Sequence, residues 1–247
     1  MFWIPKKKVF WKDLWKDGCI DIHNHLLWGI DDGSKSFEET IALSKGLQEL
    51  GITKAIATPH TYPGLWNNTA KDINSIYTTY KNLESNHFII GVASEYLAES
   101  YLEQEVQQKS ILTLPGNYIL IEFSMLFPPT ERIMESLFQL KLKGYQLILA
   151  HPERYLYWEN SLHTFEELKT FNLHFQLNTL SLLGYYGNDV KKLAIQLLNL
   201  EFYDFFGTDT HKIEQIDYHT KKALELNNKQ ILILENIINA NKEFSIF

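Results

Sequence analysis

The sequence predicts an α/β protein in which parallel strands form a barrel with helices on its outside. Short apolar runs typical of buried strands alternate along the chain with helical segments, and this alternation favours a parallel sheet. Polar residues end seven such runs at intervals of roughly 30 residues, which matches the length of a βα unit. The chain of 247 residues is long enough for one domain of this kind.

An open doubly wound sheet is the alternative architecture. It would not bring the residues of all seven strand ends together, whereas a closed barrel collects them at the carboxyl ends of its strands. No linker or low-complexity stretch divides the chain. We therefore expect an aromatic and basic N-terminal arm at residues 1–17, followed by a single barrel domain at residues 18–247.

Caps and breaks delimit the elements in the first half of the chain. Ser36 is a favourable N-cap with Glu39 three residues later as a capping box, and Gly51 ends the helix that they start. The strand that follows this helix stops at Pro59. We expect, in order, a strand at residues 19–22, a helix at Ser36–Leu50, a strand at Ile52–Thr58, a helix at Ala70–Glu84, a strand at Phe88–Ala93, a short helix at Tyr101–Gln108 and a strand at Tyr118–Ile121.

The second half continues the same alternation. Pro129 precedes the start of a helix, and Gly144 ends it. We expect a helix at Thr130–Lys143, a strand at Gln146–Ala150, a helix at Ser161–Thr170, a strand at His174–Leu177, a helix at Asp189–Leu200, a strand at Phe202–Phe206, and helices at Ile216–Leu226 and Lys229–Asn241.

Composition and charge exclude several classes of protein. A formal net charge of −7 argues against a nucleic-acid partner, because a phosphate backbone needs a basic surface. No apolar run reaches the ~18 residues of a membrane span, so we expect no membrane insertion. The N-terminus lacks a signal peptide, and the single Cys19 excludes an internal disulfide, so we expect a cytoplasmic protein. We expect the arm to pack on the domain or on a second subunit of a homo-oligomer.

Metal-ligand residues gather at the strand ends. His23 and His25 leave the same face of a strand because side chains repeat every two residues, and Asp209 and His211 repeat this spacing. Six of the seven strand ends carry His, Asp or Glu, and the seventh carries Asn178. The candidate ligands are His23, His25, Asp32, His60, Glu95, Glu122, His151, Asp209 and His211.

This ligand set is too large for one ion, since Zn²⁺ usually takes four ligands. Histidines and carboxylates without thiolates suit two or three ions of Mn²⁺, Fe or Zn²⁺. Clustered divalent ions favour hydrolysis of an anionic ester, because they bind phosphate oxygens and lower the pKa of a water molecule. The alternative is a set of unrelated polar side chains. The sequence alone does not show which of Asp31 and Asp32 is the metal ligand.

Arg154 indicates the substrate class. Only two arginines occur in the chain, and Arg132 falls in a helix where a surface role is the default. Arg154 lies three residues after His151 on a strand-end loop, where its planar fork suits a phosphate or a carboxylate. The alternative is an ion pair of Arg154 with a neighbouring glutamate, Glu153 or Glu159.

The motifs together resemble a known family. They are DIHNHLLWGIDDG, IATPH, ASEYL, ILIEFS, AHPERY and TDTH, running from Asp21 to His211. The chain resembles the polymerase and histidinol phosphatase (PHP) superfamily, and within it the manganese-dependent protein-tyrosine phosphatases of bacterial capsule and exopolysaccharide clusters. The resemblance implies a single-domain, distorted (β/α)7 barrel of the TIM-like PHP type.

The resemblance also implies roles for individual residues. One metal would take His23, His25, Glu95 and Asp209, a second would share Glu95 and add Glu122 and His151, and a third would take Asp32, His60 and His211. A metal-bridging hydroxide would attack phosphorus while Arg154 holds the phosphoryl oxygens, with Asp209 and His211 also in the catalytic set. The ions would be Mn²⁺, with Fe or Zn²⁺ as alternatives.

One departure from the family concerns substrate binding. Members often carry a second arginine after the final motif, and here the segment reads HKIEQIDYHT. Lys212 or His219 are the candidates for its role, although a lysine is not a bidentate fork. Trp28, Tyr62, Trp66 and Phe127 lie on strand-end loops and are candidates to pack a phenyl ring, with ordinary rim or core packing as the alternative.

The resemblance implies hydrolysis of phosphotyrosine in proteins. The expected substrate is a bacterial tyrosine kinase that regulates capsule or exopolysaccharide synthesis. A first alternative keeps the chemistry but acts on histidinol phosphate or another small phosphomonoester. An amide hydrolase is less favoured, because such barrels commonly use a bridging lysine and no expected strand end carries one. An inactive interaction module is disfavoured by the full ligand set.

Overall fold

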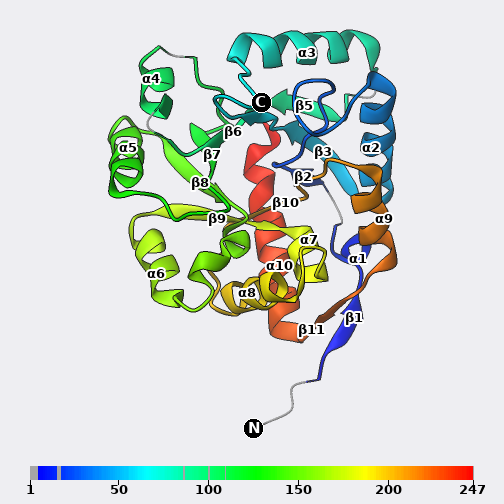
Figure 1. The fold of residues 1–247 in the computed structure, drawn as a ribbon. Coiled ribbons are helices and arrows are strands. Elements are labelled where there is room, and N and C mark those ends of the chain that lie inside the picture. Colours follow the sequence, from blue (N-terminus) through cyan, green and yellow to red (C-terminus); the bar gives the residue numbers. More distant parts are fainter. Residues whose placement is uncertain (1–4, 16–17, 86, 100, 109, 247) are drawn as a thin grey trace.

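Helices surround a strongly curled parallel sheet in the computed structural model of the protein (Figure 1). The structure describes residues 5–15, 18–85, 87–99, 101–108 and 110–246. Residues 1–4 and 16–17 of the expected N-terminal arm lie outside the described residues. Within the described part, no helix is both long and apolar enough to span a bilayer.

The strands form two parallel sheets and one antiparallel pair. The larger sheet has the order β10-β9-β8-β7-β6-β4, and the smaller has the order β2-β3-β5. The strands are β1 (Lys7–Val9), β2 (Cys19–Asp21), β3 (Ile52–Ala57), β4 (His60–Thr61), β5 (Ile89–Val92), β6 (Glu95–Leu97), β7 (Tyr118–Glu122), β8 (Gln146–Ala150), β9 (Leu173–Asn178), β10 (Phe205–Gly207) and β11 (Leu224–Leu226).

Two of the expected strands are interrupted, and the interruptions join the two sheets. The strand expected at Ile52–Thr58 ends at Ala57 and resumes as β4, while the strand expected at Phe88–Ala93 ends at Val92 and resumes as β6. β3 pairs with β5 in the small sheet, and β4 pairs with β6 in the large one, with His60 opposite Glu95. The change from the small sheet to the large sheet therefore occurs next to two candidate ligands, His60 and Glu95.

The first and last parallel strands meet at their carboxyl ends. Asn24 and Thr210 form a parallel bridge, and the backbone N–H of Asp209 donates to the carbonyl of His23 at 2.7 Å. The buried carboxylate of Asp21 accepts hydrogen bonds from the Thr208 backbone and hydroxyl at 3.0 and 2.6 Å. The α/β class and the curled parallel sheet agree with the sequence, whereas a fully closed (β/α)7 barrel stays a prediction.

Helices α2 to α6 follow one another around the sheet in the order of the chain, while α10 crosses the middle of the view in Figure 1. The α-helices are α1 (Trp11–Leu14), α2 (Phe37–Glu49), α3 (Ala70–Leu83), α4 (Tyr101–Gln107), α5 (Glu131–Leu142), α6 (Leu162–Thr170), α7 (Thr179–Leu183), α8 (Asn188–Asn199), α9 (Ile213–Lys221) and α10 (Asn228–Ala240), and the 3₁₀ turns are η1 (Pro152–Arg154), η2 (Leu156–Trp158) and η3 (Asn241–Ser245). Ser36 caps α2 as predicted, by accepting from the Glu39 N–H. The reciprocal half of the predicted capping box is wrong, because the Glu39 carboxylate accepts from the Lys35 N–H instead.

The helix expected at Ile216–Leu226 is wrong in its last part. α9 ends at Lys221, and Leu224–Leu226 form β11, which pairs antiparallel with β1. The alternation of buried Leu224, exposed Glu225 and buried Leu226 has the two-residue period of a strand, which explains the difference. The described part of the arm thus packs on the domain, where Trp11 and Trp15 are buried and stack with ring centroids 5.0 Å apart.

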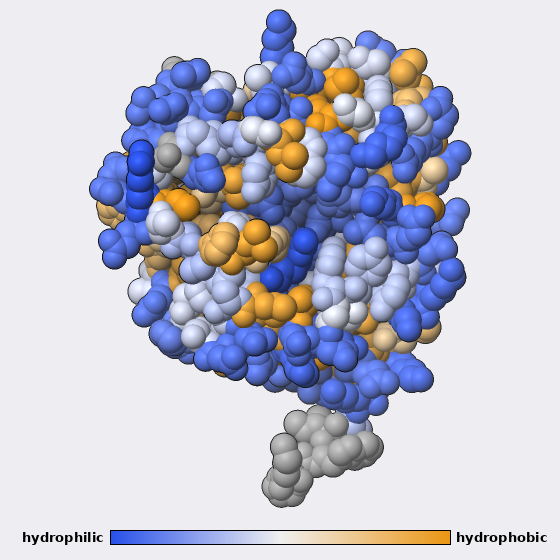
Figure 2. Space-filling view, viewed as in Figure 1, coloured by the Kyte–Doolittle hydropathy of each residue, from blue (hydrophilic) through white to orange (hydrophobic). Residues whose placement is uncertain are grey.

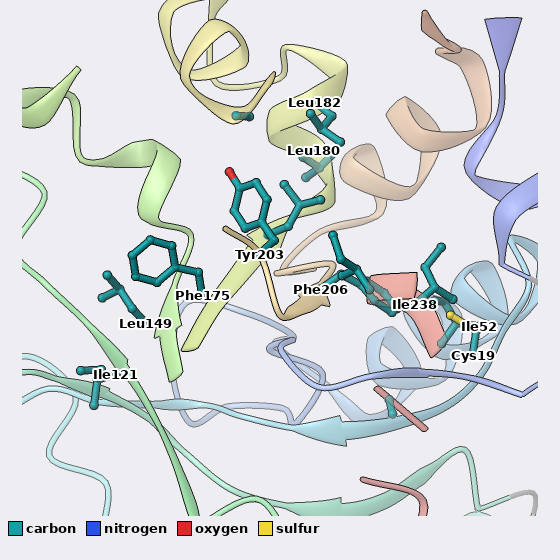
Figure 3. Close-up of a cluster of buried hydrophobic side chains, with 14 of the residues drawn as sticks. Cys19, Ile52, Ile121, Leu149, Phe175, Leu180, Leu182, Tyr203, Phe206 and Ile238 are labelled. Carbon is teal, nitrogen blue, oxygen red and sulfur yellow. The ribbon is translucent and has the colours of Figure 1, made fainter. Parts of the chain in front are cut away.

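The hydrophobic core lies between the sheet and the helices. Side chains from successive strands form a continuous apolar layer, as Figure 3 shows for Cys19, Ile52, Ile121, Leu149, Phe175 and Phe206. Leu180, Leu182 and Ile238 contribute to the same layer from the helices. This layer fixes the outward faces of the strands and leaves their carboxyl ends for polar side chains.

Asn241 bridges β2 and β10 from the end of α10. Its side-chain amide donates to the carbonyls of Ile20 and Phe206 at 2.9 and 2.8 Å, and its oxygen accepts from the Phe206 N–H at 3.2 Å. The side chain is fully buried. Asn241 therefore satisfies backbone groups of two strands that a continuous ladder does not join.

We expect Asn241→Ala to lower the free energy of unfolding by about 2 kcal/mol or more, because buried backbone groups lose their partners. Urea denaturation followed by circular dichroism measures the change. Asn239→Ala is the matched control, since Asn239 is exposed on α10. Equal small effects of the two substitutions would contradict a bridging role for Asn241.

Candidate metal centre

Glu95 is the centre of a buried cluster at the carboxyl ends of the strands. Its Oε2 lies 3.1 Å from His23 Nε2 and 3.4 Å from His25 Nε2. Asp209 Oδ1 faces the same two rings at 3.5 and 3.4 Å. The two histidines follow β2 and Asp209 follows β10, so the junction between the first and last strands builds this part of the cluster.

The other side of Glu95 faces the strands that follow in the sheet. His151 Nε2 lies 3.0 Å from Glu95 Oε1, and His60 Nδ1 lies 3.2 Å from Glu95 Oε2. Glu122 Oε1 is 3.4 Å from His60 Nδ1, and Glu122 Oε2 is 3.9 Å from His151 Nε2. Candidate residues from β4, β6, β7 and the end of β8 thus meet at one carboxylate.

Asp31 and Asp32 occupy different environments. Asp32 is half exposed, and its Oδ1 lies 3.3 Å from His211 Nε2 and 3.6 Å from His60 Nε2. Asp31 is buried, and its Oδ2 accepts from His25 Nδ1 at 2.7 Å and from the His60 backbone N–H at 3.0 Å. Asp32 therefore faces the open side of the cluster, while Asp31 orients two of its histidines from behind.

Further side chains orient the rings from outside the cluster. His23 Nδ1 donates to Gln176 Oε1 at 2.7 Å, and His211 Nδ1 donates to the Asp209 carbonyl at 2.9 Å. Such bonds fix which ring nitrogen is free to coordinate. Sequence reasoning missed Gln176, although its signal is present: it lies two residues before Asn178 on β9, on the same face of the strand.

The donor set fits divalent cations. Four groups each have ligand atoms within 4.8 Å of one another: His25, Asp32, His60 and His211; His23, His25 and Glu95; His23, His151 and Asp209; and His60, Glu95 and Glu122. Among the described residues, the buried Glu95 Oε2 and His60 Nδ1 face the cluster without a hydrogen-bond partner. Buried polar atoms without partners are rare in native proteins, and cations at these positions would satisfy them.

The charges of the cluster require a positive counterpart. Burial and the charge of Glu95 hold the pKa of Glu122 well above its usual range. Burial lowers the pKa of His25, but the neighbouring carboxylates of Asp31, Asp209 and Glu95 raise it well above its ordinary value. Bound cations would take over the neutralisation that protons otherwise provide.

Arg154 lies at the edge of the cluster. Its Nη1 donates to Asp209 Oδ2 at 2.9 Å, so the expected alternative of an ion pair with Glu153 or Glu159 is wrong. Glu153 is instead buried, where it accepts from the Asn178 N–H and from the Tyr203 hydroxyl. The guanidinium also stacks on the ring of Tyr186, 4.5 Å from its centroid. Two independent contacts therefore set the position of the fork.

Asn178 and Tyr186 complete the surroundings of Arg154. Asn178 Nδ2 donates to Asp209 Oδ2 at 2.8 Å and lies 3.1 Å from the Tyr186 hydroxyl. Asn178 thus joins the other six strand ends in one site, as the barrel interpretation predicts. Tyr186 was missed, because it follows the short helix α7 that the sequence pattern did not indicate.

The residues 19–241 match the family described as "Capsular polysaccharide synthesis, CpsB/CapC". The chain belongs to the CpsB/CapC family. The putative tyrosine-protein phosphatase CapC of Staphylococcus aureus is 30% identical over 214 residues, covering 82% of this chain and 81% of CapC. Tyrosine-protein phosphatase YwqE of Bacillus subtilis is 30% identical over 216 residues, covering 85% of this chain and 84% of YwqE.

A solved structure agrees with this CpsB/CapC assignment. A crystal structure from work on YwqE of Bacillus subtilis and CpsB of Streptococcus pneumoniae, described as unique metal-dependent tyrosine phosphatases, matches with a TM-score of 0.74 and 27% identity, covering 87% of this chain and 86% of that one. An amidohydrolase from Mycoplasma synoviae, 12% identical with a TM-score of 0.53, shares the fold alone. The resemblance to phosphatases of capsule clusters is confirmed.

The residues expected to bind substrate lie at different depths in this CpsB/CapC chain. Lys212 is exposed immediately after His211, at the start of α9. Tyr62 is half-buried and packs edge-on against Trp66, whose ring stacks on His60 with centroids 4.6 Å apart. Trp28 is half-buried and packs edge-on against Phe37. Phe127 is exposed on the loop after β7.

His219 does not reach the site. Its ring is buried 5.5 Å from that of Trp15, and its two nitrogens lie 2.8 Å from the Thr179 hydroxyl and 2.9 Å from the Gln215 carbonyl. The suggestion that His219 replaces the second arginine is therefore wrong, because its ring is buried and both of its nitrogens contact other partners in the core. Burial lowers the pKa of His219 to about 4.

This pKa predicts a pH-dependent contribution to stability. The unfolded chain binds a proton near pH 6.5 that the folded chain excludes until about pH 4, so stability is lost as the pH falls through this window. Relative to His219→Gln, the native protein should lose about 2 kcal/mol of unfolding free energy between pH 7 and pH 5. Denaturation at both pH values measures it. His163→Gln, at an exposed position, should show no such difference.

Proposed function

We propose that this CpsB/CapC chain is a metal-dependent phosphatase that hydrolyses phosphotyrosine in proteins. The observation that carries the proposal is the buried cluster around Glu95 with the Arg154 guanidinium at its edge. The metal-dependent tyrosine phosphatases YwqE and CpsB support it as relatives. The proposed substrate is a bacterial tyrosine kinase that regulates capsule or exopolysaccharide synthesis. A cytoplasmic location stays a prediction.

The proposed ligand sets follow the motifs and are compatible with the distances. His23, His25, Glu95 and Asp209 would hold one ion, and Glu95, Glu122 and His151 would hold a second. Asp32, His60 and His211 would hold a third, and the exposure of Asp32 beside both histidines favours it over Asp31. We propose Mn²⁺ as the metal, with two or three ions per chain, and Fe or Zn²⁺ as alternatives.

The protein's own groups would position the phosphoryl group. Divalent ions in the cluster would polarise phosphate oxygens and lower the pKa of a water molecule. Arg154 would bind a phosphoryl oxygen through guanidinium donors other than the Nη1–H that contacts Asp209. Asp209 and the Tyr186 ring hold this fork in place, so little conformational entropy is lost when it binds. Lys212, Tyr62 and Trp28 stay proposals for substrate contact.

Hydrolysis of histidinol phosphate is the second candidate function. It uses the same cluster and the same arginine, so the choice between the two depends on what surrounds the phosphate. The aromatic group of Tyr62 and Trp66 beside His60 favours an aromatic ester, because it offers ring faces and edges next to the cluster. Parallel assays of a phosphotyrosine peptide and histidinol phosphate distinguish the two candidates.

Metal removal tests the cluster directly. We expect chelation to abolish hydrolysis of a phosphotyrosine peptide and Mn²⁺ to restore it, with elemental analysis giving at least two ions per chain. Glu95→Gln should lower this metal content, because its carboxylate lies within 3.4 Å of four candidate histidines. Full phosphatase activity in the metal-free protein would contradict the proposal.

Arg154 is tested against the other arginine of the chain. Arg154→Ala should lower kcat/KM for a phosphotyrosine peptide by about 10²–10³, the usual effect of losing one charged donor at the reacting group. Arg132→Ala is the matched control, since Arg132 is exposed on α5 and should leave the rate unchanged. Elemental analysis of both variants separates loss of phosphate binding from loss of metal. Equal rates for the two variants would exclude the role.

A further inference from the structure

Several exposed apolar side chains lie in segments that follow the strands ending in the cluster. Of the thirteen large apolar side chains that are exposed in the described part of the chain, six lie in segments that follow the carboxyl ends of strands. We call them the apolar rim: Leu65, Leu126, Phe127, Leu156, Tyr185 and Ile213. They come from the segments after β4, β7, β8, β9 and β10.

Four of the six rim residues lie within two positions of a member of the site in the chain. Leu65 precedes Trp66, whose ring stacks on that of His60. Tyr185 packs edge-on against Tyr186, whose ring stacks with the Arg154 guanidinium. Leu156 and Ile213 each lie two residues after Arg154 and His211 respectively. Figure 2 shows a hydrophilic hollow near the centre of one face, with hydrophobic residues beside parts of its edge.

Leu126 and Phe127 are the most exposed pair of the rim, at 77% and 70%. The loop beneath them is held in place: the Leu126 N–H donates to Ser124 Oγ at 3.2 Å, and the Tyr157 hydroxyl donates to the Ser124 carbonyl at 3.2 Å. Two prolines follow at 128 and 129 and restrict the backbone further. The pair is thus presented outward by a pre-organised loop, which lowers the entropy lost on binding.

We propose that the apolar rim binds the polypeptide on either side of the phosphotyrosine and selects substrates with large apolar residues there. The inference rests on the proposed function and adds a substrate class to it. A polar centre within an apolar surround fits a protein ligand, whereas a small phosphate ester would contact only the centre.

Other occupants fit the rim less well. A second copy of this chain seated on the rim would cover the cluster that it surrounds. An anionic membrane would be repelled by a chain with a formal net charge of −7. An uncharged, apolar stretch of polypeptide has no such cost and leaves the phosphate free to enter the hollow.

The test compares two substrates and two double variants. One phosphotyrosine peptide carries Leu and Phe beside the phosphotyrosine, and its twin carries Ser at the same positions. L126S/F127S removes the main rim contact. L83S/L142S is the matched control, because Leu83 and Leu142 are 58% and 65% exposed at the ends of α3 and α5 that lead into β5 and β8, away from the cluster.

We expect the native protein to hydrolyse the apolar peptide with a kcat/KM about tenfold above that of the serine peptide, mainly through KM. L126S/F127S should abolish this preference by raising KM for the apolar peptide to about that of the serine peptide. L83S/L142S should keep the preference. Because all four substituted positions are exposed, thermal melts should show both variants folded, and Leu65→Ser provides a second rim variant.

Several outcomes would overturn the inference. One is a native protein that does not distinguish the two peptides, and another is an equal loss for both peptides in L126S/F127S. A change in oligomeric state or vesicle binding without a change in peptide preference would assign the rim to those partners instead. If no phosphate ester is hydrolysed in the presence of Mn²⁺, the proposed function itself fails, and the inference fails with it.

Discussion

A buried carboxylate surrounded by imidazoles is the constraint on which the site depends. Glu95 is almost completely buried, and its two oxygens face His23, His25, His60 and His151. A charge in this position is costly unless positive charge and directed donors surround it. The surrounding strands supply these groups. Asp31 accepts a hydrogen bond from the His25 ring, and Gln176 accepts one from the His23 ring, which fixes the orientation of both rings. Because the sheet is curled, the carboxyl ends of these strands meet at Glu95.

The junction between the first and last strands serves the same purpose. His23 and Asp209 lie on either side of it, joined by one backbone hydrogen bond of 2.7 Å. Asp21 bonds to Thr208 just after β10, and Asn241 bonds to Phe206 in the middle of β10. These buried polar side chains stabilise a contact between strands that a full ladder does not join. The geometry of the cluster therefore depends on residues that never face it.

The sequence could predict the members of the cluster because their signal is local. A strand that ends in a histidine or a carboxylate is visible in a few residues, and six strand ends of this kind occur in the expected order. The curled parallel sheet follows from the same alternation. β11 was assigned to a helix because Leu224–Leu226 are only three residues, and their pairing partner Lys7–Val9 is far away in sequence.

The separate roles of Asp31 and Asp32, the stacking of Arg154 on Tyr186 and the interior position of His219 could not be predicted. Each of them depends on tertiary contacts between elements, because neighbouring residues of the same chemical type can point to opposite sides of a turn. Composition and spacing therefore identified which residues belong to the cluster, but not which side chains are buried behind it or in the core.

The junction between β2 and β10 also has a consequence for how the chain folds. His23 and Asp209 come from opposite ends of the sequence, so their contact cannot form during synthesis until nearly the whole chain has left the ribosome. Contacts of such long sequence separation form slowly, because the closure of a large loop must precede them. Metal uptake by the complete cluster would therefore be among the last events of maturation, and a truncated chain would lack the site however well its first strands fold.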